Sequence, residues 1–202
     1  MRRDRSPRQR LDPGERQERI LDAATAAFAA TPYDDVALAP VAAAAGASEA
    51  LVYRYFAGKA GLYAAVVQRS VDDLVAAHEE ALAQLAPAVP ARDRVRAATL
   101  AYLEHVARHP SGWLAPLARS EGEPEPAATI RRDARADYVA RLRGLLQPGV
   151  GTRREYALWG FFGFLNAAAL RWLAEGCPED ARWPLVDAAL GALEGGLGDW
   201  AA

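Results

Sequence analysis

Residues 45–62 read AGASEALVYRYFAGKAGL, and this stretch decides the fold. Gly46 separates two short apolar segments, and the hydroxyl of Ser48 stands where it would cap the free backbone N–H groups of a new helix. Four large side chains then follow in a row at positions 53–56. They cannot all face one core, so some of them must point outward, and outward aromatic and basic side chains need a reason.

Two short helices joined by a tight, glycine-containing turn are the layout of a helix-turn-helix. In that motif the N-terminal part of the second helix enters the major groove of DNA and contacts base edges. We expect Val52 and Phe56 to be the inner anchors of the second helix. Its outward side chains would then face phosphate and base, and these are Glu49, Ala50, Tyr53, Arg54 and Tyr55.

The span from Arg16 to Val67 resembles the DNA-binding domain of the TetR family of transcriptional repressors. The resemblance runs without a gap through the turn Ala45–Ser48, the aromatic segment Tyr53–Phe56 and the segment Gly58–Leu62. It implies a regulator that binds a DNA operator. The contact residues that it implies are Ala37, Ser48, Glu49, Ala50, Tyr53, Arg54, Tyr55 and Lys59.

Several of these positions depart from the family pattern. Ala37 replaces the threonine that usually caps the first helix of the motif, and Tyr55 replaces a histidine. Glu49 stands at a position that is often small, polar or basic, where its carboxylate repels phosphate but can accept a hydrogen bond from the amino group of cytosine. The operator sequence of relatives therefore cannot be transferred to this chain.

The distribution of charge indicates that any nucleic-acid site is local, because the net charge of the 202 residues is only −2. Residues 1–10 carry five arginines against one aspartate, so an arm over residues 1–12 either lies along DNA or is a solvated tail. Lys59, the single lysine, begins a long helix, and both its ammonium and the helix N-terminus favour a phosphate.

Apolar residues recur with the helical period along the whole chain, which predicts an all-α protein of about nine helices. We expect an N-terminal arm over 1–12, a three-helix helix-turn-helix domain over 13–60, and a larger helical domain over 61–202. The predicted helices cover residues 13–30, 38–45, 48–56, 59–85, 92–108, 113–119, 126–146, 153–175 and 179–197.

The resemblance implies that the larger domain binds a small-molecule effector and forms a homodimer, and the candidate pocket residues favour a largely apolar or aromatic effector. Mostly aromatic side chains are typical of such pockets, and the candidates are Tyr102, Leu103, His105, Val106, Trp113, Leu117, Tyr138, Leu142, Trp159, Phe162 and Asn166. Arg135 and Arg141 are expected to be solvated. Small and apolar residues on the last two helices favour close packing against a second copy, and these are Gly160, Gly163, Ala167, Leu185, Ala189 and Leu193.

Other classes of function are less well supported by the residues. No catalytic triad, phosphate loop or metal cluster can be assembled, and His78, His105, His109 and Cys177 do not form a metal site, so we expect neither an enzyme nor a cofactor. A lone cysteine and the absence of a secretory signal or a clear membrane span favour a cytoplasmic protein. An activator, a regulator without a ligand and a non-specific architectural DNA binder remain alternatives.

Overall fold

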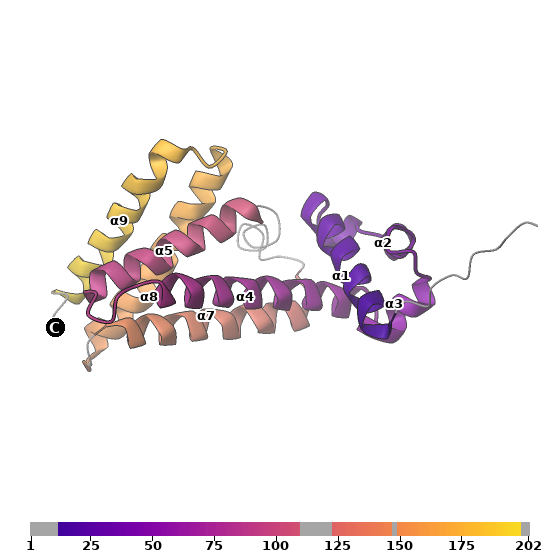
Figure 1. Cartoon of the computed structure of the whole chain (residues 1–202), viewed down its shortest axis with the longest axis horizontal. Helices are drawn as coiled ribbons and strands as arrows, with labels where there is room; N and C mark the ends of the chain where they lie inside the picture. The colour runs from indigo at the N-terminus through magenta and orange to yellow at the C-terminus, as the bar shows by residue number, and fades with distance from the viewer. Residues whose placement is uncertain (1–11, 110–122, 147–148, 199–202) are drawn as a thin grey trace, which may run out of the picture.

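The computed structural model describes residues 12–109, 123–146 and 149–198 of the chain. Over these residues the chain forms eight α-helices and one short 3₁₀ turn, and no strand occurs among them. Figure 1 shows a small group of helices at one end of an elongated molecule and a larger bundle at the other end. The predicted all-α class is confirmed, and the expected short helix over 113–119 lies outside the described residues.

The small group consists of α1 (Pro13–Ala30), the 3₁₀ turn η1 (Tyr33–Asp35), α2 (Leu38–Ala44) and α3 (Glu49–Phe56). The carboxylate of Asp12 caps α1 by accepting a hydrogen bond from the backbone N–H of Gly14 at 3.0 Å. The apolar faces of these helices meet in one buried cluster, whose members include Ile20, Ala24, Phe28, Val41, Val52 and Phe56. This is the predicted helix-turn-helix, and η1 is an element that the sequence reading missed.

The connection between α3 and α4 (Lys59–Ala83) is a sharp elbow. It begins at Ala57, whose φ of 53° is left-handed, and continues through Gly58 with a φ of 99°. Gly61 then passes so close to α3 that a Cβ atom on it would lie 1.8 Å from the carbonyl oxygen of Phe56. Only glycine fits this crossing, so the residue fixes how α3 is seated on the start of α4.

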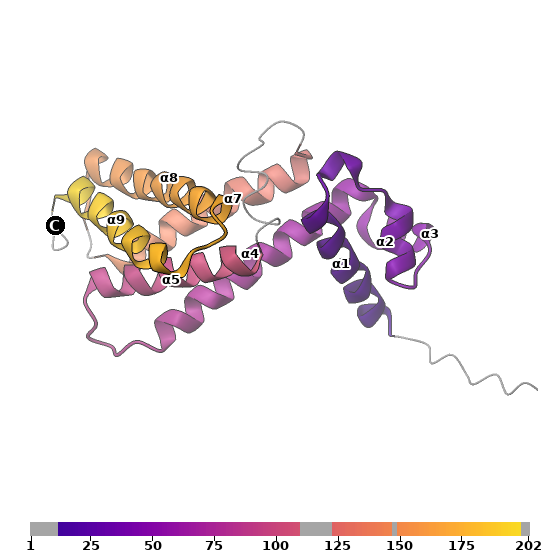
Figure 2. The same ribbon diagram turned by 90° about the horizontal axis from the view of Figure 1, so that it is seen from above.

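The long helix α4 links the two ends of the molecule. Its first two turns bury Leu62, Tyr63 and Val66 in the cluster of the helix-turn-helix, and Leu74 belongs to the core of the larger bundle. There α4 packs against α5 (Ala91–Arg108) and α7 (Glu125–Leu145), and Figure 2 shows the same arrangement from above. A movement of α4 in the larger bundle would therefore reach the helix-turn-helix directly.

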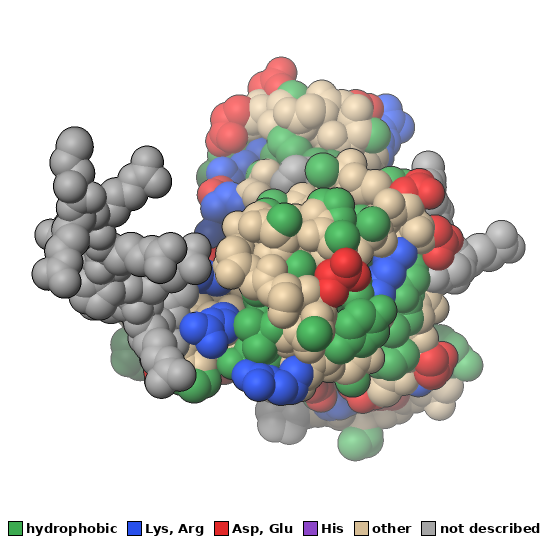
Figure 3. All heavy atoms as spheres, turned by 90° about the vertical axis from the view of Figure 1, so that its right-hand side faces the viewer, with side chains coloured by type: hydrophobic (Ala, Val, Ile, Leu, Met, Phe, Trp, Pro, Cys, Tyr) green, Lys and Arg blue, Asp and Glu red, His purple; other side chains and the backbone are tan. Residues whose placement is uncertain are grey.

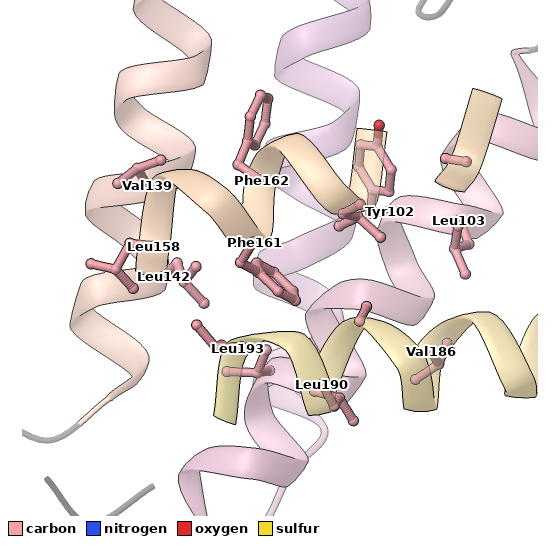
Figure 4. Close-up of a cluster of buried hydrophobic side chains, with 14 of the residues drawn as sticks. Tyr102, Leu103, Val139, Leu142, Leu158, Phe161, Phe162, Val186, Leu190 and Leu193 are labelled. Carbon is pink, nitrogen blue, oxygen red and sulfur yellow. The ribbon is translucent and has the colours of Figure 1, made fainter. Parts of the chain in front are cut away.

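The last two helices, α8 (Thr152–Ala174) and α9 (Glu179–Leu197), pack against each other as a hairpin that covers α5. In the core that they share, Phe161 points toward Leu190 and Leu193 of α9, whereas Phe162 leaves the other side of α8 (Figure 4). The two adjacent aromatics therefore serve different parts of the bundle.

Helix α8 is long and apolar enough to cross a membrane by length and composition, although only 39% of its most apolar window is buried within the chain. One face of α8 is in the core, but Tyr156, Trp159 and Phe164 are 75%, 43% and 38% exposed on the opposite side. The helix therefore carries a second apolar face that its own chain leaves uncovered.

Candidate nucleic-acid interface and effector cavity

Helix α3 has one buried and one exposed face. Val52 is fully buried and Phe56 is nearly so, whereas Tyr53 is 57% exposed and Arg54 lies beside it in solvent. The hydroxyl of Ser48 caps the helix by accepting a hydrogen bond from the backbone N–H of Leu51 at 3.3 Å. The predicted cap and the predicted inner anchors are both present, and the N-terminal half of α3 faces away from the body of the chain.

Tyr55 differs from its two exposed neighbours, because it is only half-exposed and packs against Phe56 with 6.4 Å between ring centroids. The guanidinium of Arg54 stands over the Tyr55 ring at 5.3 Å. Tyr55 therefore supports the side chain of Arg54 as much as it faces outward.

Three other expected contact residues stand at helix N-termini. Ala37 is the N-cap of α2 and makes no side-chain hydrogen bond there, in agreement with the loss of the threonine cap. Glu49 and Ala50 form the exposed first turn of α3. The carboxylate of Glu49 thus lies at the end of α3 that would enter a groove.

Lys59 is the first residue of α4, as predicted, but its ammonium already has partners within the chain. It donates a hydrogen bond to the carbonyl oxygen of Asp34 at 2.9 Å and lies 4.6 Å from the centroid of the Tyr33 ring. Lys59 therefore holds η1 against the start of α4, and its contact with phosphate stays a prediction.

The face of the molecule at the helix-turn-helix end lacks a continuous basic band among the described residues. Figure 3 shows separate basic and acidic side chains with hydrophobic side chains filling much of the area between them. Between residues 12 and 67 the sequence holds four basic and seven acidic residues. Residues 12–67 therefore attract DNA phosphates only weakly, and recognition of DNA would depend on a few well-placed side chains.

Two adjoining cavities lie between α4 and α7. The first, of about 50 Å³, is bounded by Leu74 of α4, Arg135 of α7 and Phe162 of α8, among others. The second, of about 200 Å³, extends between Val95 of α5 and Leu142 of α7. His78, Tyr138 and Arg141 line both cavities. Both are smaller than the usual ligand pocket of roughly 300–1,000 Å³, so a ligand would have to separate α4 from α7.

Three of the expected pocket residues line these cavities, namely Tyr138, Leu142 and Phe162. Others belong to the solid core: Leu103 and Val106 are fully buried, and the hydroxyl of Tyr102 donates a hydrogen bond to Asn166 at 2.6 Å. His105, also buried, shares a hydrogen bond of 3.2 Å with Ser70. Trp113 and Leu117 lie outside the described residues.

Trp159 lines neither of the two cavities, because it is 43% exposed on the outer face of α8. The prediction that Trp159 lines the pocket is not met by either cavity. The sequence reading also missed part of the lining. Arg135 and Arg141 are exposed, as expected of solvated residues, yet both border the cavities together with His78 and Arg131.

Burial changes the acid–base behaviour of two histidines and one tyrosine of the larger bundle. It lowers the pKa of His78 to about 4, with the nearby Arg141 cation adding to the effect, and a hydrogen bond with the backbone of Ala98 opposing it. Burial, together with the neighbouring His109 and Arg108, also lowers the pKa of His105 to about 4. Both imidazoles are therefore neutral at physiological pH. Burial raises the pKa of the Tyr138 phenol, which stays protonated.

The expected dimerisation residues divide into two groups. Gly160, Gly163 and Ala167 are exposed on the outer face of α8, and Leu185 of α9 is half-buried. Ala189 and Leu193 are fully buried in the core of their own chain, so the expectation that they meet a second copy is wrong. The exposed face of α9 instead presents the apolar or small residues Pro184, Ala188, Gly191, Ala192 and Gly195, interrupted by the carboxylates of Asp187 and Glu194.

Among the described residues, no group of three or more histidine, cysteine, aspartate or glutamate side chains is placed to hold a metal ion. Cys177 is a free thiol whose pKa is raised by burial.

Comparison with known proteins identifies the helix-turn-helix region. The sequence profile of the family described as "Bacterial regulatory proteins, tetR family" matches residues 20–66, from α1 into the second turn of α4. The HTH-type transcriptional activator FasR of Mycolicibacterium smegmatis is 32% identical over 143 residues. The match covers 67% of this chain and 64% of that relative, so the chain spans less than two thirds of the relative's length.

Solved structures share the fold over nearly the whole chain. A tetR-family transcriptional regulator from Streptomyces coelicolor is similar with a TM-score of 0.73 and 23% identity, covering 93% of this chain and 81% of that one. The transcriptional regulator FadR from Bacillus subtilis, solved in complex with stearoyl-CoA, has a TM-score of 0.65 and 17% identity. That match covers 88% of this chain and 95% of FadR. At such low identity these likenesses establish the fold alone.

Proposed function

Because residues 20–66 place this chain in the TetR family of bacterial regulatory proteins, we propose that it is a DNA-binding transcriptional regulator that reads an operator with α3. The observation that carries the proposal is the division of α3 into two faces. Val52 and Phe56 anchor one face in the core, and Tyr53 and Arg54 are exposed on the other. Rigidly anchored side chains that project from a helix are what the major groove requires.

Such a regulator needs one part that binds DNA and another that binds the effector and forms the dimer. We assign DNA binding to residues 13–60 and effector binding and dimerisation to residues 61–202, with residues 1–12 as a basic arm. Helix α4 belongs to both parts, since its first turns bury Val66 and Val67 in the apolar cluster of the helix-turn-helix. That shared helix is the physical route from the effector cavities to α3.

A homodimer formed through α8 and α9 is supported by apolar surface that the chain itself leaves uncovered. Tyr156, Trp159 and Phe164 are exposed along α8, and large exposed apolar patches mark interfaces. The exposed face of α9 adds Trp183, which is 53% exposed, and a row of small residues. Two copies of each helix would form a four-helix interface related by a two-fold axis.

The glycines on these faces support the same assignment. A Cβ atom on Gly160, Gly163, Gly191 or Gly195 would meet nothing within 4 Å, so packing within the chain does not require glycine at these positions. Glycine inside a helix costs roughly 1 kcal/mol relative to alanine. Close approach of a partner helix explains why small residues stand there.

The effector is a small molecule with a largely apolar body. Apolar side chains of α4 and Phe162 of α8 form one side of the first cavity and α7 forms the other, so a ligand that opens it would push α4 away from α7. The fold neighbour FadR was solved with stearoyl-CoA, a molecule with a long apolar chain. Displacement of α4 would change the separation of the two recognition helices in a dimer, and a dimer matches two half-sites only at one spacing.

The direction of regulation has two candidates. We propose a repressor that leaves a palindromic operator when the effector binds. The second candidate is an activator, which the name of the M. smegmatis relative favours. A reporter gene behind the chain's own operator separates them: removal of the protein raises expression under a repressor and lowers it under an activator.

Selection of DNA from a random double-stranded pool, at roughly physiological salt, tests the proposed function. The purified full-length protein is expected to enrich an inverted repeat, whose half-site spacing then measures the separation of the two α3 helices. If the folded, dimeric protein enriches no sequence, the proposal fails.

A further inference from the structure

Three arginines of α7 border the first cavity: Arg131, Arg135 and Arg141. Arg131 and Arg135 are one helical turn apart, and such spacing places side chains on the same side of a helix. The opposite walls are apolar and include Leu74 of α4 and Phe162 of α8. The cavity thus combines a cationic edge with an apolar floor.

The arginines around this cavity differ in whether a carboxylate pairs with them. Among the described residues, Arg135 has no carboxylate partner, and its exposed guanidinium stands over the Phe162 ring at 5.6 Å. Arg141 is paired with Glu79 at 3.1 Å, and Asp137 is the one carboxylate in the described lining of the first cavity. His78 is neutral because burial lowers its pKa to about 4. An anion would therefore find an available guanidinium at the mouth.

Arg131 is held differently, in a buried ion pair. Its Nε atom donates a hydrogen bond to Oε1 of Glu123 at 2.7 Å, and the two side chains are only 9% and 13% exposed. The hydroxyl of Tyr63 donates to the same carboxylate oxygen at 3.5 Å. If a ligand draws Arg131 away, the buried carboxylate of Glu123 loses its countercharge, which is a strongly unfavourable change.

Tyr63 connects this ion pair to the helix-turn-helix. Its ring lies 4.9 Å from Phe28 of α1 and 5.1 Å from Tyr33 of η1, measured between ring centroids. The ammonium of Lys59 lies over that same Tyr33 ring. Glu123 is therefore linked through Tyr63 to the aromatic cluster that seats α1 and η1 on the first turns of α4.

We propose that the α4–α7 cavity binds an amphipathic anion and that the anion acts by competing with Glu123 for Arg131. Arg135 receives the acidic group, Arg131 turns toward it, and the apolar chain lies against Leu74 and Phe162. Loss of the Arg131–Glu123 pair releases Tyr63 from its hydrogen bond with Glu123. The packing of α1 and η1 against the first turns of α4 then becomes looser. This inference rests on the proposed function of the cavity as the effector site, and it specifies a carboxylate or phosphate on an apolar chain.

The ligand class is tested by calorimetric titration of the full-length protein. The probes are saturated carboxylates from octanoate to hexadecanoate, the alcohols of matching length and the corresponding alkyl phosphates, each below the concentration at which it forms micelles. At least one acid is expected to bind about tenfold or more tightly than its alcohol, because only the acid makes charge-assisted hydrogen bonds. The carboxylate and phosphate arms identify the preferred head group.

Substitutions on α7 localise the effect. Arg135→Gln is expected to abolish the preference for the acid and to leave the affinity for the alcohol unchanged. Arg132→Gln is the matched control, since Arg132 is the exposed neighbour that pairs with Glu125 at 3.3 Å and does not line the cavity. Equal affinity for acid and alcohol, no binding by any acid, or equal effects of the two substitutions would each overturn the proposal.

The coupling is tested with Tyr63→Phe and Glu123→Gln. Tyr63→Phe is expected to bind the acid within about twofold of the wild type, and Glu123→Gln is expected to bind it more tightly, because no carboxylate then competes for Arg131. In both variants the acid should change the affinity for the selected operator far less than the roughly tenfold change expected for the wild type. Circular dichroism and thermal melting check folding, and Tyr63→Phe, which keeps the ring, suffices if Glu123→Gln does not fold. A full response in a folded variant would overturn the coupling.

Failure of this inference is distinct from failure of the proposed function. Operator selection is carried out without any probe, so an enriched operator together with no response to any acid overturns only the anion mechanism. If the protein enriches no operator, the DNA-binding proposal itself falls.

Discussion

At the scale of single residues, the alternation of roles along α3 was predictable because a short helix on a small core has only one inward face. Val52 and Phe56 are separated by one helical turn, and both are buried as predicted. Tyr53 and Arg54 follow Val52 directly, and both face solvent. Tyr55 was predicted to face outward, but it lies at the edge of the buried face of α3 and its ring is half-covered.

The missing cap of α2 is expected to cost stability. Ala37 is the N-cap, has extended backbone angles and makes no side-chain hydrogen bond. Serine is favoured at the N-cap of a helix, because its hydroxyl oxygen can accept a hydrogen bond from a backbone N–H of the first turn. Ala37→Ser should therefore raise the free energy of unfolding by about 1 kcal/mol. Urea unfolding measures the change, and an unaltered midpoint would show that another group already satisfies the first turn.

The two buried histidines predict loss of stability in mild acid. The pKa values of His78 and His105 are lowered to about 4 from the ordinary 6.5, so between those pH values the unfolded chain binds more protons than the folded chain. The free energy of unfolding should therefore fall as the pH falls through this range, on the order of 1–2 kcal/mol per histidine by about pH 5. Urea unfolding at a series of pH values measures it.

Glutamine at both positions should flatten that profile between pH 6.5 and 5, because glutamine does not titrate. An unfolding free energy of the wild type that is constant over this range would contradict the burial of neutral imidazoles.

At the scale of elements, helix boundaries were predictable from local signals. The bounds of α1 and α9 agree with the prediction, and those of the other described helices differ by one or two residues at one or both ends. The inward face of α9 was not predictable in the same way, because its outward face also carries a row of apolar or small residues. Ala189 and Leu193 face the chain's own core, and the row from Pro184 to Gly195 faces outward. Periodicity alone does not distinguish two apolar faces.

The elbow between α3 and α4 yields a sharp prediction. A Cβ atom at residue 61 would overlap the carbonyl of Phe56, so Gly61→Ala should force α3 away from α4. We expect a loss of about 1–3 kcal/mol in the free energy of unfolding and reduced operator affinity. Gly144→Ala in α7 is the control, because its Cβ meets nothing within 4 Å. Equal behaviour of both variants would show that the close crossing is not needed.

At the scale of the whole molecule, the sequence could not show which side chains meet across the bundle. The cavities combine residues of α4, α5, α7 and α8 that are up to about ninety positions apart in the chain. Aromatic residues such as Tyr102 were reasonable pocket candidates by type, but packing placed Tyr102 in the solid core. The arginines of α7 were treated as solvated because a helical pattern does not reveal that an exposed side chain borders a cavity.

The proposed dimer predicts opposite effects of one substitution on the single chain and on the assembly. Gly163 has open space around its Cβ position, so Gly163→Ala should stabilise the isolated chain by about 1 kcal/mol through helix propensity. The added methyl group would hold a closely packed partner helix away and raise the dissociation constant of the dimer. Sedimentation at several protein concentrations measures this, and a dimer of unchanged strength would exclude this face as the interface.

The central claim is that α3 reads DNA sequence, and competition binding at fixed salt tests it most directly. Fluorescence anisotropy compares the selected inverted repeat with a duplex of the same composition in shuffled order, for the wild type and for Tyr53→Ala. We expect the wild type to prefer the repeat by roughly a thousandfold or more, and Tyr53→Ala to lose much of that preference while it binds the shuffled duplex as before. Equal affinity of the wild type for both duplexes would contradict the account.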